Sequence, residues 1–226
     1  MNLLCGVMGV IFALEGWFDM AFYLMLAGAV CDFCDGLAAR LLKAYSDLGK
    51  ELDSLADLIT FGLLPSIMLY KCMDMYHPGE WYCFLPLIIV VFSALRLAKF
   101  NVDERQSENF LGLATPACAM WCGSLIYAAD HGVMSMANML HDTYLIPAAS
   151  VVLAILLVSE IPMFSFKFKK GSADNRIRIC FLGIVAFFAI ATLILKINWS
   201  YIVLLTFTAY IMLNVLTALF TLKLKK

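Results

Sequence analysis

Long apolar runs separated by short polar breaks make up most of the chain. Most of the runs approach the roughly 20 residues that a helix needs to cross the hydrocarbon core of a bilayer. The breaks are rich in Gly, Pro, Asn and Asp, which favour turns. The pattern predicts helices over 2–15, 17–44, 48–75, 80–100, 113–129, 142–161, 176–196 and 199–222.

Composition agrees with a membrane protein. Of the 226 residues, 63% are hydrophobic and 15% are charged, whereas a soluble domain is nearer half apolar and a quarter charged. The sequence shows neither an internal repeat nor a linker. It therefore predicts an all-α polytopic membrane helix bundle of about eight transmembrane helices, with residues 1–226 forming a single domain.

Basic residues are distributed unevenly over the predicted loops. If the helices alternate in direction, 14 of the 16 Lys and Arg residues fall on one side, and only Lys71 and Lys196 fall on the other. Cytoplasmic loops carry this excess, so both termini are expected to face the cytoplasm. The lack of basic clusters interleaved with aromatics indicates no nucleic-acid partner, whereas the net charge of -1 argues neither for nor against one.

Four aspartates stand at the junction of the second and third predicted helices. Asp32 and Asp35 are three residues apart, and Asp53 and Asp57 are four apart, so each pair shares a helix face. A short loop makes the two helices antiparallel neighbours, which allows the pairs to meet. A carboxylate inside a membrane helix is costly and usually marks function.

Four carboxylates at close quarters repel one another unless a cation neutralises them. Oxygen ligands suit Mg2+ or Mn2+, which would bridge phosphate oxygens. Gly36 and Gly49 leave room for a ligand, and Arg40 offers a planar donor suited to phosphate. The nearby charges Asp47, Lys50 and Glu51 are interpreted as solvated loop charges.

These residues carry a resemblance. The pattern Asp32-x2-Asp35-Gly36-x2-Ala39-Arg40-x8-Gly49-x3-Asp53-x3-Asp57 resembles the complete signature of the CDP-alcohol phosphatidyltransferase family. The resemblance implies that Asp32, Asp35 and Asp53 hold the metal, that Asp57 assists them and acts as the base, and that Gly36, Ala39 and Arg40 line the CDP site. It also implies a homodimer with a six-helix core plus two helices, embedded in the inner (cytoplasmic) membrane with its active site facing the cytoplasm.

Other segments of the sequence limit the choice of acceptor alcohol. Residues 2–6, 95–102, 110–117 and 159–167 resemble the membrane-embedded phosphatidylserine synthases of that family, although many relatives read Gly-Leu-Pro where this chain has Gly112-Leu113-Ala114. The resemblance implies transfer of the phosphatidyl group from CDP-diacylglycerol to L-serine, with release of CMP.

Acceptor-binding residues are expected at the end of the fourth predicted helix. Arg96, Lys99 and Asn101 place two cations and an amide there, and an arginine fork suits a carboxylate such as that of serine. Glu160 either pairs with an ammonium group or caps the sixth helix.

Two alternatives remain open. In the first, the reaction is the same but the acceptor is glycerol phosphate, inositol phosphate or another small alcohol. A phosphorylated acceptor, however, should need a denser basic pocket. A transporter that uses the acids as a relay would be expected to show broken helices in two repeated halves, which the sequence lacks.

The first predicted helix is short. From Asn2 to Leu14 it has 13 residues, which reach about 20 Å at ~1.5 Å per residue, against a hydrocarbon core of about 30 Å. Either the true start lies upstream of Met1, or Asn2 and its neighbours line a water-filled substrate cavity. Both possibilities place residues 1–6 beside the acidic cluster, with Asn2 contributing to the CDP-diacylglycerol site together with Gly49.

Overall fold

The computed structural model describes residues 1–43, 46–102, 110–131, 144–163, 174–195 and 199–224. Within these ranges the chain is almost wholly helical. Four of the described helices are long and apolar enough to cross a membrane: Phe18–Leu41, Asp47–Tyr76, Trp81–Val102 and Ser200–Ala218. The protein is an all-α membrane helix bundle, as the hydrophobic pattern predicts.

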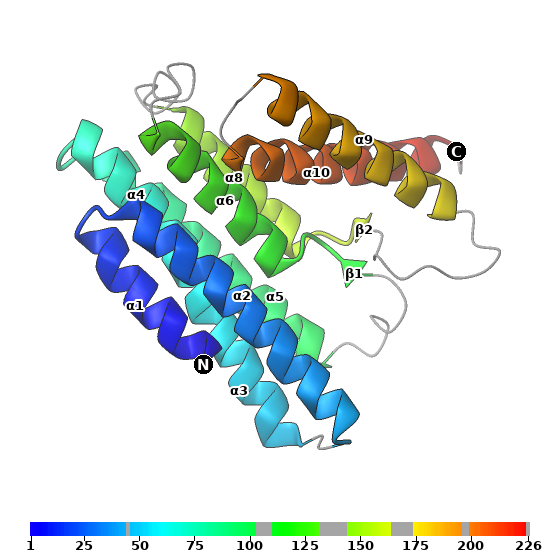
Figure 1. The fold of residues 1–226 in the computed structure, drawn as a ribbon, viewed down its shortest axis with the longest axis horizontal. Coiled ribbons are helices and arrows are strands. Elements are labelled where there is room, and N and C mark those ends of the chain that lie inside the picture. Colours follow the sequence, from blue (N-terminus) through cyan, green and yellow to red (C-terminus); the bar gives the residue numbers. More distant parts are fainter. Residues whose placement is uncertain (44–45, 103–109, 132–143, 164–173, 196–198, 225–226) are drawn as a thin grey trace.

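The helices follow the order of the predicted runs (Figure 1). They are α1 (Asn2–Leu14), α2 (Phe18–Leu41), α3 (Asp47–Asp57), the π-helical η1 (Leu58–Leu63), α4 (Leu64–Tyr76), the 3-10 helix η2 (Trp81–Leu87), α5 (Ile88–Val102), α6 (Thr115–Asp130), α8 (Leu145–Val158), α9 (Asp174–Leu195) and α10 (Ser200–Leu224). In Figure 1, α1, α2, α4, α5, α6 and α8 run along one common direction, and α9 and α10 lie together at one side.

Local chemistry shifts several predicted boundaries. The predicted helix to residue 44 ends at Leu41, and Lys43 has a left-handed φ of 52°. The run 48–75 is one helical stretch interrupted by the π-helix η1. The run 80–100 begins as a 3-10 helix that contains Pro86, a residue without the N–H that an α-helix interior needs.

The hydrophobic pattern did not predict one small element, a pair of two-residue strands. Strand β1 (Phe110–Leu111) pairs antiparallel with strand β2 (Pro162–Met163). The pairing continues through Gly112, whose φ is 78° and whose N–H donates to the Ile161 carbonyl at 3.0 Å. Runs of two residues carry no usable period, so the hydrophobic pattern predicts only loops here. The pairing ties the start of α6 to the end of α8.

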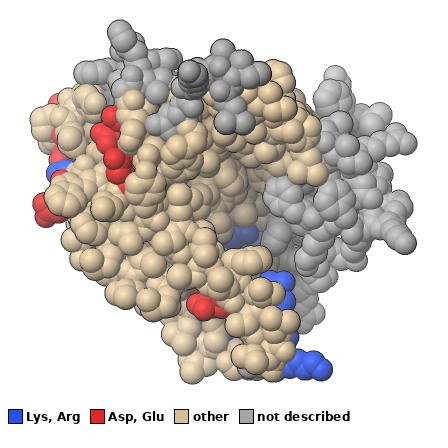
Figure 2. Space-filling view, in the orientation of Figure 1, with Lys and Arg blue, Asp and Glu red and all other residues tan. Residues whose placement is uncertain are grey.

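The core lies among α2, η1, α4 and α6. Phe22, Met25, Phe61, Met68 and Ile126 are fully buried or nearly so. The outer surface is largely uncharged in Figure 2, and the visible charges gather mainly toward the ends of the bundle. That distribution suits helices whose sides face lipid. The basic residues Arg105, Lys167, Lys169, Lys170, Lys225 and Lys226, on which the predicted orientation partly depends, lie outside the described residues.

The end of the bundle that carries the aspartates projects beyond this core. The buried residues of α2 stop at Gly28, and in α3 only Ala56 is buried. Figure 1 shows α3 and the last turns of α2 extending past the neighbouring helices. The acidic pairs therefore stand on helix ends that the rest of the bundle leaves partly uncovered.

Candidate active site

The short helix α1 packs unusually closely against its neighbours. Its buried residues are Asn2, Gly6, Gly9 and Ala13, spaced four, three and four apart, so they form one small-residue face. A Cβ on Gly6 would collide with Thr60, and one on Gly9 would come within 2.6 Å of Leu64. Small residues permit this backbone approach between membrane helices. The packing brings the start of α1 against η1, directly after Asp57.

Asn2 is joined to Asp57 at that contact. Its Nδ2 donates to Asp57 Oδ1 at 3.0 Å, and its carbonyl accepts a hydrogen bond from Thr60 Oγ1 at 3.1 Å. Asn2 is only 4% exposed. The prediction that the start of the chain lies beside the acidic cluster is thus confirmed for Asn2.

Three of the four aspartates meet in one group. Carboxylate oxygens of Asp32, Asp53 and Asp57 all lie within 4.8 Å of one another. The spacing argument is confirmed for these three. Asp35 lies outside the group, although it follows Asp32 by three residues on the same face of α2. The π-helical turn that begins after Asp57 is a distortion that occurs often at functional sites.

A divalent cation fits this group on the chemistry of its donors. The three carboxylates come from two helices, and their close approach is electrostatically unfavourable unless a cation or protons offset it. All the ligand atoms are oxygens, which suit Mg2+ or Mn2+ rather than softer metals.

A pocket of about 240 Å³ opens beside the same aspartates. It is lined by Lys50, Asp53, Ser54, Asp57, Arg96, Leu97, Phe100, Asn101, Ala114 and Pro116. Two of these, Asp53 and Asp57, also belong to the carboxylate group, so the pocket and the acids form one continuous site between α3, α5 and the start of α6.

Arg96 is the buried cation of the pocket. It is 8% exposed, its Nη1 donates to Thr115 Oγ1 at 2.9 Å, and its guanidinium carbon lies 5.8 Å from the centre of the Phe100 ring. Its Nε is buried and makes no hydrogen bond among the described residues. An unused buried donor is costly, and an anion in the pocket would satisfy it.

A family model described as CDP-alcohol phosphatidyltransferase matches residues 1–161. The chain belongs to the CDP-alcohol phosphatidyltransferase family. Members transfer a phosphatidyl group from a CDP-alcohol to an acceptor, and the family depends in general on a divalent metal. The matched residues end after α8, so α9 and α10 lie beyond the family core.

Curated relatives are similar over most of the chain. A CDP-diacylglycerol--serine O-phosphatidyltransferase of Bacillus subtilis is 32% identical over 174 residues, covering 77% of this chain and 90% of the relative. Proteins of the same name from Helicobacter pylori and Mycobacterium leprae are 33% and 31% identical, covering 74% and 93% of this chain and 69% and 70% of the relatives.

The remaining residues of the family signature lie around the carboxylates. Arg40 is exposed near the end of α2, one turn after Gly36, and its Nη2 would be 3.7 Å from a Cβ on Gly36. Ala39, which lies between Gly36 and Arg40 in the sequence, is half-buried. The N–H of Gly49 donates to Ser46 Oγ at 3.0 Å, which caps α3, and a Cβ there would crowd that oxygen. Gly49 thus has a structural role beside the predicted ligand-binding one.

Asn101 fastens α5 to α3 across the mouth of the pocket. Its Nδ2 donates to Ser54 Oγ at 2.9 Å and to Glu51 Oε1 at 3.3 Å, and its carbonyl accepts from Lys50 Nζ at 2.9 Å. The interpretation of Asp47, Lys50 and Glu51 as solvated loop charges is confirmed for their exposure. It is wrong about the loop, because all three lie in α3 and Lys50 and Glu51 bond to Asn101. Helix α3 begins at Asp47, which puts both on its first turns and facing α5.

Lys99 is placed differently from Arg96 and Asn101. It is not among the pocket-lining residues, and its Nζ lies 3.5 Å from Glu160 Oε1. Of the two roles considered for Glu160, pairing with an ammonium group is the one observed, and the ammonium belongs to the protein itself. Side chains that are 41% and 71% exposed make this pair a weak one.

Sequence reasoning missed three contributors to the pocket. Thr115 holds Arg96, Ser54 holds Asn101, and Phe100 packs beside the guanidinium. Ser54 had a detectable signal, since it lies between Asp53 and Asp57 one turn after Lys50. Nothing in the linear pattern couples Thr115 to Arg96, because 19 residues separate them.

Proposed function

We propose that this protein transfers the phosphatidyl group of CDP-diacylglycerol to L-serine, giving phosphatidylserine and CMP. The observation that carries the proposal is the buried Arg96, with its unused Nε, in a pocket that Asp53 and Asp57 also line. Family membership supplies the reaction class, and the names of the relatives point to serine.

The acceptor binds in the pocket with its carboxylate toward Arg96. Thr115 fixes one side of the guanidinium, and a carboxylate takes up donors in the fork geometry that arginine prefers. Asn101, at the pocket mouth, closes the site around the amino acid. We do not assign Lys99 to the acceptor, since Glu160 engages it outside the pocket.

The reaction is a displacement at phosphorus. The serine hydroxyl oxygen attacks the phosphorus next to the diacylglycerol, the bond from that phosphorus to the CMP oxygen breaks, and CMP leaves. Asp57 takes the hydroxyl proton. Asn2 donates to Asp57 Oδ1 and so holds the carboxylate in place for this role. A base within hydrogen-bond reach of the hydroxyl contributes about 10²- to 10⁴-fold to such a step.

The metal site of the proposal comprises Asp32, Asp35, Asp53 and Asp57. A bound Mg2+ or Mn2+ would neutralise charge on the diphosphate and its leaving oxygen. Asp35 shares the α2 face of Asp32 but lies outside the three gathered carboxylates, so it enters the proposal on the family resemblance. Asn2, Gly36, Ala39, Arg40 and Gly49 would surround the CDP part, with Arg40 as its exposed phosphate donor.

The proposed setting is the inner membrane. The excess of basic residues on one side supports a cytoplasmic location of the site, where CDP-diacylglycerol enters from the leaflet and serine from the water. A homodimer is part of the proposal, on the family resemblance alone.

The test is acceptor-dependent release of CMP. Purified protein with CDP-diacylglycerol and Mg2+ or Mn2+ is given labelled serine, glycerol 3-phosphate or inositol phosphate in parallel. The proposal expects labelled lipid, and CMP release above the rate measured without any alcohol, with serine alone. Turnover with a phosphorylated acceptor and none with serine would assign the protein to the alternative acceptors of the same chemistry.

A further inference from the structure

A second group of metal-binding side chains lies at the opposite end of the bundle. It consists of Asp19 in the first turn of α2, Asp130 in the last turn of α6, and His131, which follows it. Carboxylate oxygens of the two aspartates and a ring nitrogen of His131 lie within 4.8 Å of one another. We propose that these three residues bind a divalent transition metal ion of the zinc class, distinct from the metal of the catalytic carboxylates.

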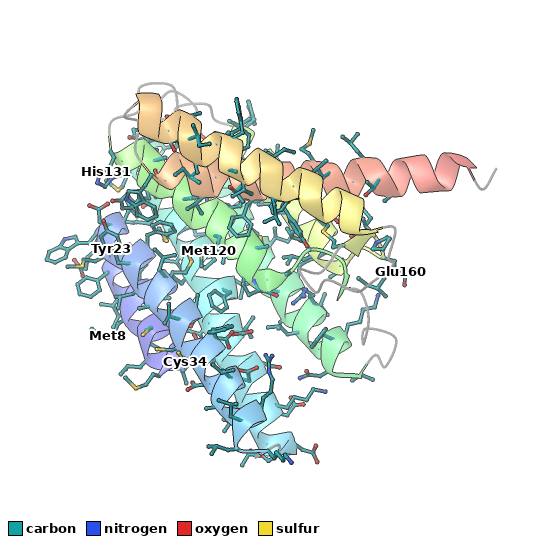
Figure 3. The ribbon with its side chains drawn as sticks, turned by 45° about the vertical axis from the view of Figure 1, so that its right-hand side comes forward. Met8, Tyr23, Cys34, Met120, His131 and Glu160 are labelled. Carbon is teal, nitrogen blue, oxygen red and sulfur yellow. The ribbon has the colours of Figure 1, made fainter. Side chains whose placement is uncertain are left out.

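The two groups are far apart although they share a helix. Asp19 and Asp32 are 13 residues apart on α2, which corresponds to about 20 Å. Figure 3 shows His131 and Tyr23 at one end of the molecule and Cys34, beside Asp35, toward the other. One ion cannot serve both groups.

An ordinary ion pair does not account for the arrangement. His131 Nδ1 is 3.4 Å from Asp19 Oδ1, beyond a good hydrogen bond. Asp19 Oδ1 is shielded from solvent and accepts no hydrogen bond among the described residues. Asp130 adds a second carboxylate to the single imidazole, so excess negative charge remains whether or not the ring is protonated. A divalent cation would offset that charge and coordinate Asp19 Oδ1, which His131 Nδ1 approaches only to 3.4 Å.

The surroundings are suited to holding such an ion. The His131 ring stacks on Tyr127, with centroids 4.2 Å apart and planes inclined by 19°, and its Nδ1 is 3.1 Å from the Tyr127 carbonyl. With Nδ1–H held by that carbonyl, the other ring nitrogen, Nε2, is the one left to bind a metal, as in most histidine ligands. A cavity of about 250 Å³, lined by Asp19, Asp130 and the turn between α1 and α2, adjoins the group and leaves room for water ligands.

The donor set indicates the kind of metal. An imidazole together with two carboxylates suits Zn2+ and similar ions, whereas Mg2+ favours oxygen ligands alone. Three protein ligands leave a coordination position open. Because Asp19 and Asp130 belong to different helices, the bound ion would join α2 to α6 at the end remote from the catalytic carboxylates.

The test measures Zn2+ binding to the full-length protein in detergent, with millimolar Mg2+ present to occupy the catalytic group. We expect one Zn2+ to bind and to raise the melting temperature. Asp19→Asn and His131→Gln should each weaken that binding at least ~10-fold. Glu80→Gln, which removes an exposed charge elsewhere, and Asp53→Asn, which alters the catalytic group, should leave it unchanged.

A measurement on the unaltered protein guards against variants that fail to fold. Zn2+ should protect His131, and not His77, from modification by diethyl pyrocarbonate, as read by mass spectrometry. Equal modification of His131 with and without Zn2+, or equal Zn2+ affinity in Asp19→Asn and Glu80→Gln, would overturn the proposal. Since Asp53→Asn abolishes catalysis but not this binding, failure here is distinct from failure of the proposed transferase activity.

Discussion

The candidate active site has two sides of different origin. On one side, Asp32, Asp53 and Asp57 gather where α2 and α3 leave the core, and Asn2 of α1 holds Asp57. On the other, Arg96 is buried beneath α6 and held by Thr115. The carboxylates are suited to metal and proton chemistry, and the arginine is suited to choosing an acceptor. We therefore expect substitutions on the two sides to change different kinetic constants.

The largest effect is expected from Asp53→Asn, on the carboxylate side. The amide keeps the size of the side chain but removes the charge that a cation needs, so turnover should fall by about 10³-fold or more. Initial rates of CMP release would measure this. Asp47→Asn removes the same charge from the exposed first turn of α3 and should stay within ~2-fold. Near-normal activity of Asp53→Asn would remove Asp53 from the metal site.

Asp57→Asn should lose turnover with little loss of substrate binding. A base acts only in the transition state, so kcat is expected to fall by about 10²-fold or more while the affinity for CDP-diacylglycerol stays nearly constant. Single-turnover rates and direct binding of the nucleotide lipid would separate these quantities. An equal loss in both would make Asp57 a ligand of the nucleotide lipid instead.

Arg96→Lys should change the KM for the acceptor and no other kinetic constant. A point charge replaces a planar fork, so the KM for serine should rise by about 10-fold, with the KM for CDP-diacylglycerol nearly unchanged. Lys99→Gln is the matched control, because Lys99 pairs with Glu160 outside the pocket. If both constants rise together in Arg96→Lys, the arginine serves the diphosphate or the fold.

The smallest effect on activity is expected from Gly28→Ala, which acts through packing. The new methyl group would come within 2.6 Å of Thr60 and 3.1 Å of Asn2 Oδ1, displacing the residue that holds Asp57. Overpacking of this kind costs about 1–3 kcal/mol, so we expect a lower melting temperature and a several-fold lower kcat. Gly183→Ala, where a Cβ meets nothing within 4 Å, should leave both unchanged. Equal behaviour of the two variants would contradict the close packing of α1.

The two sides also differ in how far sequence could predict them. The acids follow helical periodicity across one short loop, so spacing alone brought Asp32, Asp53 and Asp57 together. The family resemblance then named their chemistry. The setting of Arg96 depends on α5, α6 and the β1–β2 pair, whose contacts link residues 19 to about 50 positions apart. Linear patterns do not encode such packing, which is why Thr115 was missed and Lys99 was assigned to the pocket.

Release of CMP with and without serine tests this division of roles most directly. In the absence of serine, water is expected to act as the acceptor, so slow release of CMP should depend on the carboxylate side alone. The rate of CMP release by Arg96→Lys should then equal that of the unaltered protein without serine. When serine is added at concentrations below its KM, the rate of Arg96→Lys should be the lower of the two. Asp57→Asn should be slow under both conditions. If Arg96→Lys loses the serine-independent release to the same extent as Asp57→Asn, the two sides of the site act as one unit, and the account is contradicted.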